Sequence, residues 1–206
     1  MPLLYYRDAL KRAQKEFRSC TARGEYPYLP VLDEFVSKEE MINTSDLGTI
    51  KVPLEFIVGT RTDGRTQAFA RNFMPLMEEE SEFAGKWKSL CQSQLEEGIR
   101  DPIKAYEYMN RYYVEEGNKR VSVLKYFGAA RIPGSVTRIL PVRSDEPRIQ
   151  AYYEFLDFYK SAKVYDVQFR HPGDYAKLLE AVGKQAGEPW TEEERRTFNA
   201  YFSYFR

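Results

Sequence analysis

The chain has 206 residues, 43% of them hydrophobic, which is enough to build one sizeable domain or a core domain with appended helices. Its 31 Lys and Arg residues balance 31 Asp and Glu residues. This balance excludes a surface that is basic as a whole and typical of nucleic-acid binding, but it leaves room for a local basic patch.

Few residues are available for metal or nucleophilic chemistry. The chain has two cysteines, Cys20 and Cys91, and one histidine, His171, and it has no CxxC pair and no GxSxG nucleophile elbow. A disulfide framework, a zinc site and a serine-hydrolase triad are therefore not expected. Charged residues from Arg7 onward argue against a signal peptide, and no apolar run approaches the roughly 20 residues of a membrane helix. We expect a cytoplasmic protein that does not insert into a membrane.

The N-terminal part of the chain predicts helices interrupted by turns. Residues 3–22 have the spacing of an amphipathic helix, and Gly24 stops it. Prolines exclude a regular helix over 25–35, a short helix is expected within 31–42, and the turn-forming residues of 43–48 predict a turn.

The central part predicts strands alternating with helices. The expected elements are a strand at 50–58, a loop at 59–67, a helical stretch at 66–97 broken near Pro75, strands at 101–109 and 110–117, a helix at 118–128 and a strand at 132–142. This order predicts an α+β (mixed α/β) core with a small mixed sheet made from residues near 50–58, 103–109, 111–116 and 134–141.

The C-terminal part predicts helices at 146–162 and 190–205, a turn followed by a helix within 171–183, and a strand at 164–170. Thr191 and Glu194 have the spacing of a capping box. We therefore expect three regions: an N-terminal helical extension at 1–45, the core at 46–143, and a mostly helical subdomain at 144–206.

The stretch YYVEEGNKRVSVLKYFG, residues 112–128, is the most informative for chemistry. A strand that ends in Glu115 and Glu116 is followed by Gly117, which permits a tight turn, and then by a helix. The first backbone N–H groups of a helix favour anions, phosphate in particular. The side chains of Asn118, Lys119 and Arg120 add donors there, and a guanidinium can bind two phosphate oxygens at once.

Two alternatives stay open on these residues alone. The helix start at 117–120 is also typical of an ordinary helix with solvated basic residues. The loop and following residues at 59–73 carry Arg61, Arg65 and Arg71, with Asp63 as a candidate for a metal-bound water. That loop lies after a strand, where pocket residues are common, but an ordinary surface loop explains it equally well.

The order of motifs in the core resembles the ParB/sulfiredoxin superfamily. The likeness runs from VPL through a helical insert, "G…DPI", "VEEGNKR" and "FGA" to "IPGSV", and covers residues 50–141, about half of the chain. The EEGNKR turn, residues 115–120, is similar to the family's D/E-G-x-x-R phosphate loop. The chain also resembles the N-terminal portion of longer bacterial proteins in which a ParB-like segment precedes a substrate-binding domain of the basic-membrane-protein class.

The resemblance implies a nucleotide pocket that holds CTP or ATP with Mg²⁺. The residues that it implies for phosphate binding are Gly117, Asn118, Lys119 and Arg120. Glu115 or Glu116 would lie near the metal or act as a base, and a loop that carries Arg61 and Arg65 would close over the nucleotide.

The sequence also departs from the family. Sulfiredoxins need a cysteine where Asn118 or Lys119 stands here, so a sulfinic-acid reductase is not expected. The loop lacks the Glu-Arg-Arg of segregation ParB proteins, and no helix-turn-helix is readable after residue 143, which argues against a DNA clamp.

Three functions compete. The first is a ParB-like nucleotide-binding regulatory domain, with NTPase or phosphotransferase activity as its enzymatic form. The second is a DNA-binding transcriptional regulator or partition-like factor that reads DNA with its C-terminal helices. The third is an interaction module that has lost its ligand.

Two further expectations follow from single segments. The aromatic residues of NAYFSYFR, 199–206, predict contact with the core, another subunit or a further C-terminal domain. Arg120 is expected to face solvent, to be the most sensitive position for ligand binding, and to contribute little to folding.

Overall fold

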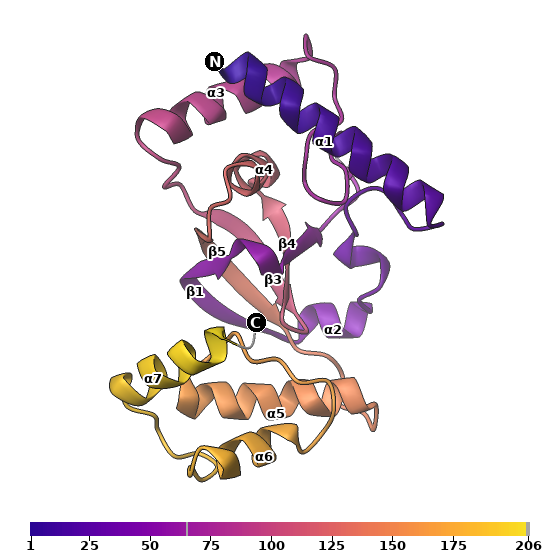
Figure 1. The fold of residues 1–206 in the computed structure, drawn as a ribbon. Helices are drawn as coiled ribbons and strands as arrows, with labels where there is room; N and C mark the ends of the chain where they lie inside the picture. Colours follow the sequence, from indigo (N-terminus) through magenta and orange to yellow (C-terminus); the bar gives the residue numbers. More distant parts are fainter. Residues whose placement is uncertain (65, 205–206) are drawn as a thin grey trace. The chain divides into compact units, whose positions relative to one another are not determined.

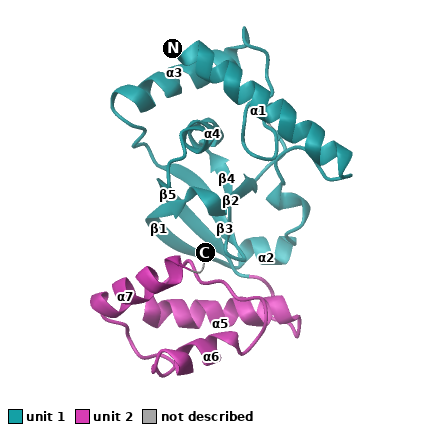
Figure 2. Cartoon of the chain, viewed as in Figure 1, with its two compact units in different colours: residues 1–140 teal, residues 141–206 magenta. Residues whose placement is uncertain are grey.

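The computed structural model describes residues 1–64 and 66–204. It divides into two compact units, Met1–Leu140 and Pro141–Arg206 (Figures 1 and 2). Arg65, predicted as a phosphate ligand, and Phe205, predicted as part of the aromatic C-terminal segment, lie outside the described residues.

The first unit is built on a five-stranded mixed sheet with the strand order β1-β5-β3-β4-β2. Its strands are β1 Thr44–Pro53, β2 Ile57–Thr60, β3 Ile103–Tyr108, β4 Arg111–Glu116 and β5 Arg131–Ile139. β3 pairs in parallel with β5, and β2 with β4, while the other two pairs are antiparallel. The predicted α+β class is confirmed, and all four predicted strand regions lie in one sheet.

Helices cover this sheet. The first unit contains α1 Pro2–Ala22, α2 Lys38–Ile42, α3 Glu82–Glu96 and α4 Asn118–Tyr126, with the 3-10 turns η1 Leu32–Glu34, η2 Leu54–Phe56 and η3 Thr66–Ala68. Figure 1 shows α4 between the sheet and the layer formed by α1 and α3. Trp87 of α3 is fully buried there, and its Nε1 donates a hydrogen bond to Ser122 Oγ of α4 at 2.9 Å. This bond satisfies the one polar atom of a large apolar side chain, so α3 and α4 are joined by packing and by a buried hydrogen bond.

Strand alternation gives the sheet two different faces. On the face toward α4 lie Ile103, Ala105 and Val114, all buried. On the opposite face, Tyr113 and Ile139 pack with Leu32, Val36 and the half-buried Tyr106. Any side chain at the end of β4 therefore belongs to one face or the other according to its position.

Two predicted boundaries in the central part are wrong. β1 begins at Thr44, inside the predicted turn, because a bulge between Asp46 and Thr49 and a positive φ of 65° at Gly48 accommodate the turn-forming residues within a strand. The strand predicted at 50–58 is divided into β1 and β2 by η2.

The helical stretch predicted at 66–97, with a break near Pro75, is also wrong over its first half. Only Glu82–Glu96 is α-helical. Before it, Phe73 has a φ of 67°, and the Asn72 side chain accepts a hydrogen bond from the Met74 backbone N–H at 3.0 Å. Such local side-chain bonding to the backbone competes with helix formation.

The second unit is helical, with α5 Pro147–Ala162, α6 Asp174–Ala181 and α7 Glu192–Ser203. The strand predicted at 164–170 is wrong: Val164 and Val167 are buried, but this segment forms no strand. The predicted capping box is confirmed, since Thr191 Oγ1 accepts from the Glu194 N–H at 3.2 Å and the Glu194 carboxylate accepts from the Thr191 N–H at 2.7 Å. Tyr201 and Tyr204 are 67% and 86% exposed, so a partner for this segment stays a prediction. Among the described helices, none has the length and apolar character needed to cross a bilayer.

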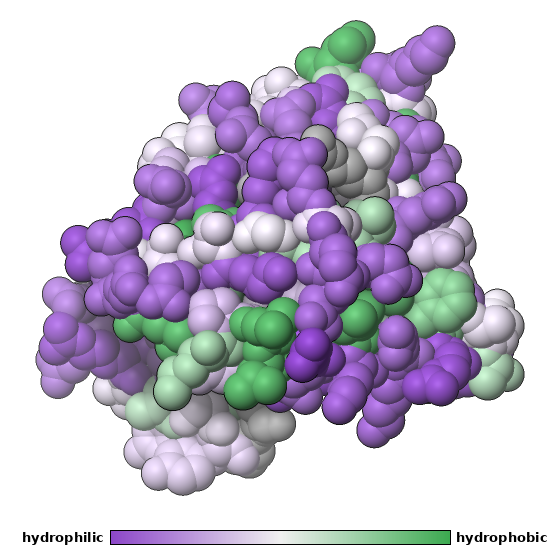
Figure 3. All heavy atoms as spheres, turned by 90° about the horizontal axis from the view of Figure 1, so that it is seen from above, coloured by the Kyte–Doolittle hydropathy of each residue, from purple (hydrophilic) through white to green (hydrophobic). Residues whose placement is uncertain are grey.

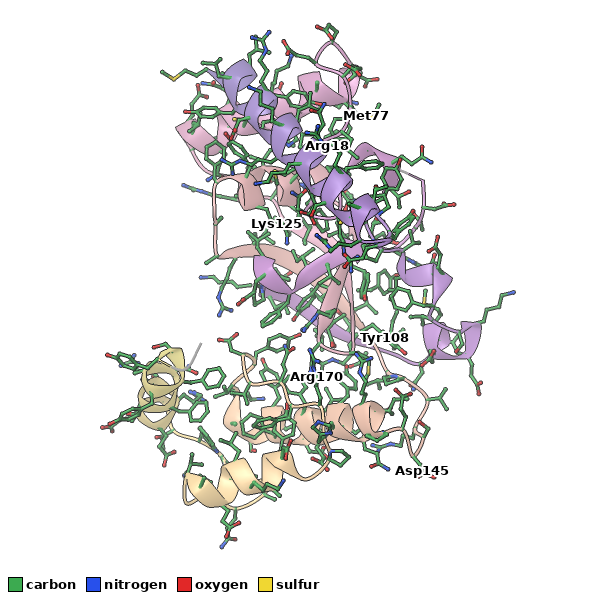
Figure 4. All side chains as sticks on the ribbon, turned by 45° about the vertical axis from the view of Figure 1, so that its right-hand side comes forward. Arg18, Met77, Tyr108, Lys125, Asp145 and Arg170 are labelled. Atoms are coloured by element: carbon green, nitrogen blue, oxygen red, sulfur yellow. The ribbon has the colours of Figure 1, made fainter. Side chains whose placement is uncertain are left out.

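Lys125 of α4, labelled in Figure 4, is a half-buried cation whose charge is unfavourable in its surroundings. Its Nζ donates to the Ile57 carbonyl at 2.9 Å and lies 5.1 Å from the centre of the Phe73 ring. Burial lowers the pKa of Lys125 to about 8, and the Glu55 carboxylate opposes this shift.

We therefore expect the free energy of unfolding to depend on Lys125 between about pH 8 and about pH 10.4, the ordinary lysine value. In that window the unfolded chain binds a proton that the folded chain has lost, so stability rises with pH. Below about pH 8 the folded chain carries the Lys125 charge, and the free-energy cost of burying that charge is then fully present. Between pH 7.5 and 9.5 the wild type should gain on the order of 1–2 kcal/mol relative to Lys125→Met.

The measurement is urea unfolding of both proteins across this range. Burial raises the pKa values of Cys20 and Cys91, which makes stability fall over the same pH values, but this contribution cancels in the difference between the two proteins. A difference that does not change with pH would show that Lys125 is not desolvated.

Candidate functional site

The junction between β4 and α4 requires glycine. Gly117 has a φ of 109°, and a Cβ atom there would lie 2.6 Å from Ile103 Cγ2 and 3.2 Å from Arg120 Nε. Since Ile103 is fully buried in the sheet, the turn cannot relax away from it. The sequence predicted that the backbone at Gly117 approaches another group closely. In the structure that group is the Ile103 side chain of the sheet.

α4 starts beside an open cleft, which we call the α4 cleft. The cleft has a volume of about 690 Å³. It is lined by Phe69, Phe83, Leu90, Asp101, Pro102, Glu115, Glu116, Gly117, Asn118, Lys119 and Arg120. The N-cap residue of α4 is Gly117, so no cap hydrogen bond from an N-cap side chain is formed here, and the first N–H groups of the helix have no intrahelical acceptor. Six of the eight predicted site residues, 115–120, line the cleft, but the Glu115 carboxylate is paired with Arg61.

Arg120 is held by its own fold, which corrects the expectation that it faces solvent. Its side chain is only 17% exposed. Nη1 donates to the Pro102 carbonyl at 2.5 Å, and Nη2 lies 3.6 Å from Glu116 Oε1. Arg120 therefore connects α4 to the start of β3, and its loss is expected to reduce stability as well as any ligand affinity.

Asn118 has one satisfied and one unsatisfied polar atom. Its Nδ2 donates to Thr60 Oγ1 of β2 at 3.3 Å, and Thr60 Oγ1 donates in turn to the Val114 carbonyl at 2.9 Å. Asn118 Oδ1 is buried without a hydrogen-bond partner among the described residues. A buried acceptor without a donor is costly, so this atom is suited to accept a hydrogen bond from a ligand.

Glu115 and Arg61 form a separate ion pair. Glu115 and Tyr113 occupy alternate positions of β4 and so point to the face opposite α4. On that face Arg61 Nη1 donates to Glu115 Oε1 at 2.5 Å and to the Tyr106 hydroxyl at 2.6 Å, and its guanidinium lies 4.4 Å from the centre of the Tyr106 ring. Arg61 is therefore engaged with Tyr106 and Glu115 rather than with the first turn of α4.

The remaining charged residues of the cleft are Lys119 and Glu116. Lys119 Nζ lies 4.5 Å from the centre of the Phe83 ring of α3, a cation–π distance. Glu116 is 62% exposed and is 3.5 Å from Lys104 Nζ. No group of three or more His, Cys, Asp or Glu side chains with metal-binding geometry occurs among the described residues. A Mg²⁺ ion would thus have to arrive with ligand phosphates, with one or two carboxylates of the chain at most.

Sequence reasoning missed the apolar wall of the cleft. Phe69, Phe83 and Leu90 come from a segment predicted as helical with a break near Pro75, and only the fold brings them to the same cleft as residues 117–120. It also missed the Pro102 carbonyl as a partner of Arg120, although DPI, residues 101–103, was identified as the start of a strand. No signal in the sequence could have revealed a backbone acceptor 18 residues away.

Comparison with solved structures finds similarity to a protein of known fold. The chain is similar to sulfiredoxin from Arabidopsis thaliana, with 22% sequence identity, over 43% of this chain and 82% of that protein, at a TM-score of 0.30. No protein-family model and no curated protein matches the chain. The resemblance to the ParB/sulfiredoxin superfamily therefore rests on residues 50–141 themselves.

Proposed function

We propose that the α4 cleft binds a nucleotide, CTP or ATP with Mg²⁺, and that the first unit is a nucleotide-binding regulatory domain. The observation that carries the proposal is the N-terminus of α4, which has no side-chain cap and opens onto a cleft of about 690 Å³. Helix N-termini of this kind favour phosphate, because their N–H groups and the helix dipole act together. Lys119 and Arg120 add two cationic side chains at the same place.

The opposite wall suits a base. Phe83 and Leu90 are half-buried and present aromatic and apolar surface to the cleft, while Phe69 in the same lining is buried. Pockets for small ligands combine such surface with a few polar groups. The buried Asn118 Oδ1 is one of these groups and would accept from a hydroxyl or amino group of the ligand.

Glu116 is the better of the two carboxylates for chemistry. Glu115 is paired with Arg61 at 2.5 Å, whereas Glu116 is 62% exposed and its nearest cations, Lys104 and Arg120, are 3.5 and 3.6 Å away. We assign one of two roles to Glu116. Its carboxylate would accept hydrogen bonds from water molecules bound to Mg²⁺, or it would act as a base if the nucleotide is hydrolysed or its phosphoryl group is transferred. Phosphate release by Glu116→Gln and by the wild type tests this role directly.

The binding test is isothermal titration with CTP, ATP, GTP and UTP in the presence of Mg²⁺. Arg120→Ala should weaken binding about tenfold to a hundredfold, because a charge-assisted hydrogen bond is lost. It should also lower the free energy of unfolding by about 1–2 kcal/mol, since the Pro102 carbonyl loses its donor. Lys119→Met should weaken binding and leave stability nearly unchanged.

Lys51→Met is the matched control, because Lys51 is an exposed lysine of β1 and does not line the cleft. If the wild type binds a nucleotide and both Lys119→Met and Arg120→Ala bind it equally well, the cleft is not the site.

A second candidate is an interaction module that has lost its ligand. The contacts of Arg120 with the Pro102 carbonyl and Glu116 favour it, because they give this side chain a structural role without any ligand. Absence of binding for all four nucleotides, together with a loss of stability in Arg120→Ala, would replace the first proposal with this one.

A further inference from the structure

The solvent-facing side of α1 carries a row of cations, which we call the α1 row: Lys11, Lys15 and Arg18. Spacings of four and three residues place the three side chains on the same side of the helix, and all three residues are exposed. Figure 4 labels Arg18 on α1. Lys11 and Arg18 are seven positions apart along the helix, so the row spans about 10 Å.

Three acidic residues lie near the row in sequence or at the end of its helix. Glu16 Oε1 accepts a hydrogen bond from Cys20 Sγ at 3.4 Å, and the other two are paired with cations. Asp8 is paired with Arg12 at 2.8 Å, and Glu25 is paired with Arg23 at 3.0 Å and with Arg71 at 3.5 Å. Within residues 1–64 and 66–204, neither Lys11 nor Lys15 forms a hydrogen bond or an ion pair. Arg18 donates its Nε only to the Gln14 backbone carbonyl at 3.2 Å. The row is thus a local excess of positive charge on a chain that is neutral as a whole.

A groove of about 440 Å³ adjoins the row. It is lined by Gln14, Phe17, Arg18, Tyr28, Gln67 and Leu76. The rings of Phe17 and Tyr28 contact each other edge to face, with their centres 5.3 Å apart. The exposed amides of Gln14 and Gln67 offer donors and acceptors beside these rings. Arg18 belongs to both the row and the groove, so the two features form one surface.

We propose that this surface binds a single-stranded nucleic acid. The α1 row contacts successive phosphates, and an unstacked base enters the groove against Phe17 and Tyr28. Aromatic stacking combined with a cationic track is the common way of binding single strands, and glutamine amides match base edges. The proposal is independent of the α4 cleft, which lies at other residues.

Two other anionic partners fit less well. A duplex keeps its bases stacked and would leave the aromatic groove unused. An amphipathic helix that binds an anionic membrane needs a free apolar face, but Tyr6, Ala9 and Ala13 of α1 are fully buried in the cluster that also holds Trp87. In Figure 3, which views the molecule from above, hydrophilic side chains cover most of the visible surface and hydrophobic ones form smaller groups.

The test is fluorescence anisotropy of the full chain with three labelled probes of 12 nucleotides: oligo-U, oligo-dT and an abasic deoxyribose-phosphate strand. Three phosphate contacts predict a slope of about −2 for log K against log salt, or roughly a twentyfold loss of affinity between 50 and 200 mM salt. The strands with bases should bind at least about fivefold more tightly than the abasic strand. Comparison of the affinities for oligo-U and oligo-dT shows whether the surface prefers RNA or DNA.

Two variants separate phosphate from base contacts. The first variant replaces the α1 row and should bring the slope of log K against log salt close to zero: Lys11→Gln/Lys15→Gln/Arg18→Gln. Its control removes three exposed lysines elsewhere and should keep the slope of the wild type: Lys86→Gln/Lys160→Gln/Lys177→Gln. Phe17→Leu should remove the advantage over the abasic strand without changing the slope. If Phe17→Leu unfolds, Gln14→Ala/Gln67→Ala, which changes only exposed side chains, supplies the same comparison.

Four results would overturn the proposal: no binding of either strand at 50 mM salt, equal binding of the abasic strand, tighter binding of a 12-base-pair duplex, or binding of phosphatidylserine vesicles without binding of strands. A further result would reject the α1 row as well: weaker strand binding by Lys119→Met, whose stability should be nearly that of the wild type, would move the strand to the α4 cleft.

Discussion

Gly117→Val is expected to lower the free energy of unfolding of the first unit by about 2–4 kcal/mol and to abolish ligand binding in the α4 cleft. Two costs add. A φ of 109° is strained for any side chain, and the Cβ would lie 2.6 Å from Ile103 Cγ2. Ile103 cannot yield, because a Cβ at Gly134 on the neighbouring strand would itself lie only 3.1 Å from Ile103 Cγ1.

Two other glycines separate these costs. Gly128 has a φ of 69° with no atom within 4 Å of its Cβ position, so Gly128→Ala should cost only about 1 kcal/mol of backbone strain. Gly85 lies in α3 with no neighbour and no positive φ, so Gly85→Ala should stabilise the chain by about 0.5–1 kcal/mol.

Tryptophan fluorescence can follow the first unit alone. The chain has two tryptophans, Trp87 in the first unit and Trp190 in the second. Urea unfolding in a Trp190→Phe background therefore reports on Trp87. A Gly117→Val protein as stable as Gly128→Ala would contradict the collision with Ile103.

The same residues show what the sequence could predict. The two strands at 103–108 and 111–116, the glycine turn and α4 follow each other within 24 residues, and their pattern was sufficient because the contacts that form them are mostly local. β1 was misplaced because it pairs with β5, about 90 residues away, and that pairing overrides the turn preference of TSDLG.

Partners of the charged side chains could not be predicted for a related reason. Sequence reasoning placed Arg61 and Arg120 at one nucleotide, Arg120 in the phosphate loop and Arg61 in a separate loop that would close over the ligand. In the structure Arg61 contacts Glu115 and Arg120 lies near Glu116. Adjacent strand positions point to opposite faces, so two neighbouring carboxylates acquired different cations. Which carboxylate each arginine contacts depends on the face of the sheet that the arginine reaches, and tertiary structure determines that face.

Arg138→Met is expected to cost about 3–5 kcal/mol of stability, because it removes the cation from a buried ion pair. Glu107 is fully buried, the Arg138 side chain is 12% exposed, and Arg138 Nε donates to Glu107 Oε2. The pair also supports the turn between β3 and β4, since Glu107 Oε1 accepts from the Asn110 N–H at 2.7 Å. Asn110 has a φ of 62°, a conformation that needs such local support.

The double variant Glu107→Gln/Arg138→Met tests whether the cost comes from the charge. A glutamine keeps an acceptor for the Asn110 N–H but carries no charge, so the double variant should be more stable than Arg138→Met alone. Urea unfolding of the wild type, both single variants and the double variant gives the coupling between the two residues. In Arg138→Met the Glu107 carboxylate stays buried without its cation, and Glu107→Gln removes that charge. A double variant less stable than Arg138→Met would therefore show that the unpaired carboxylate is not the source of the cost. The loss in the single variant would then come from the packing of the arginine stem.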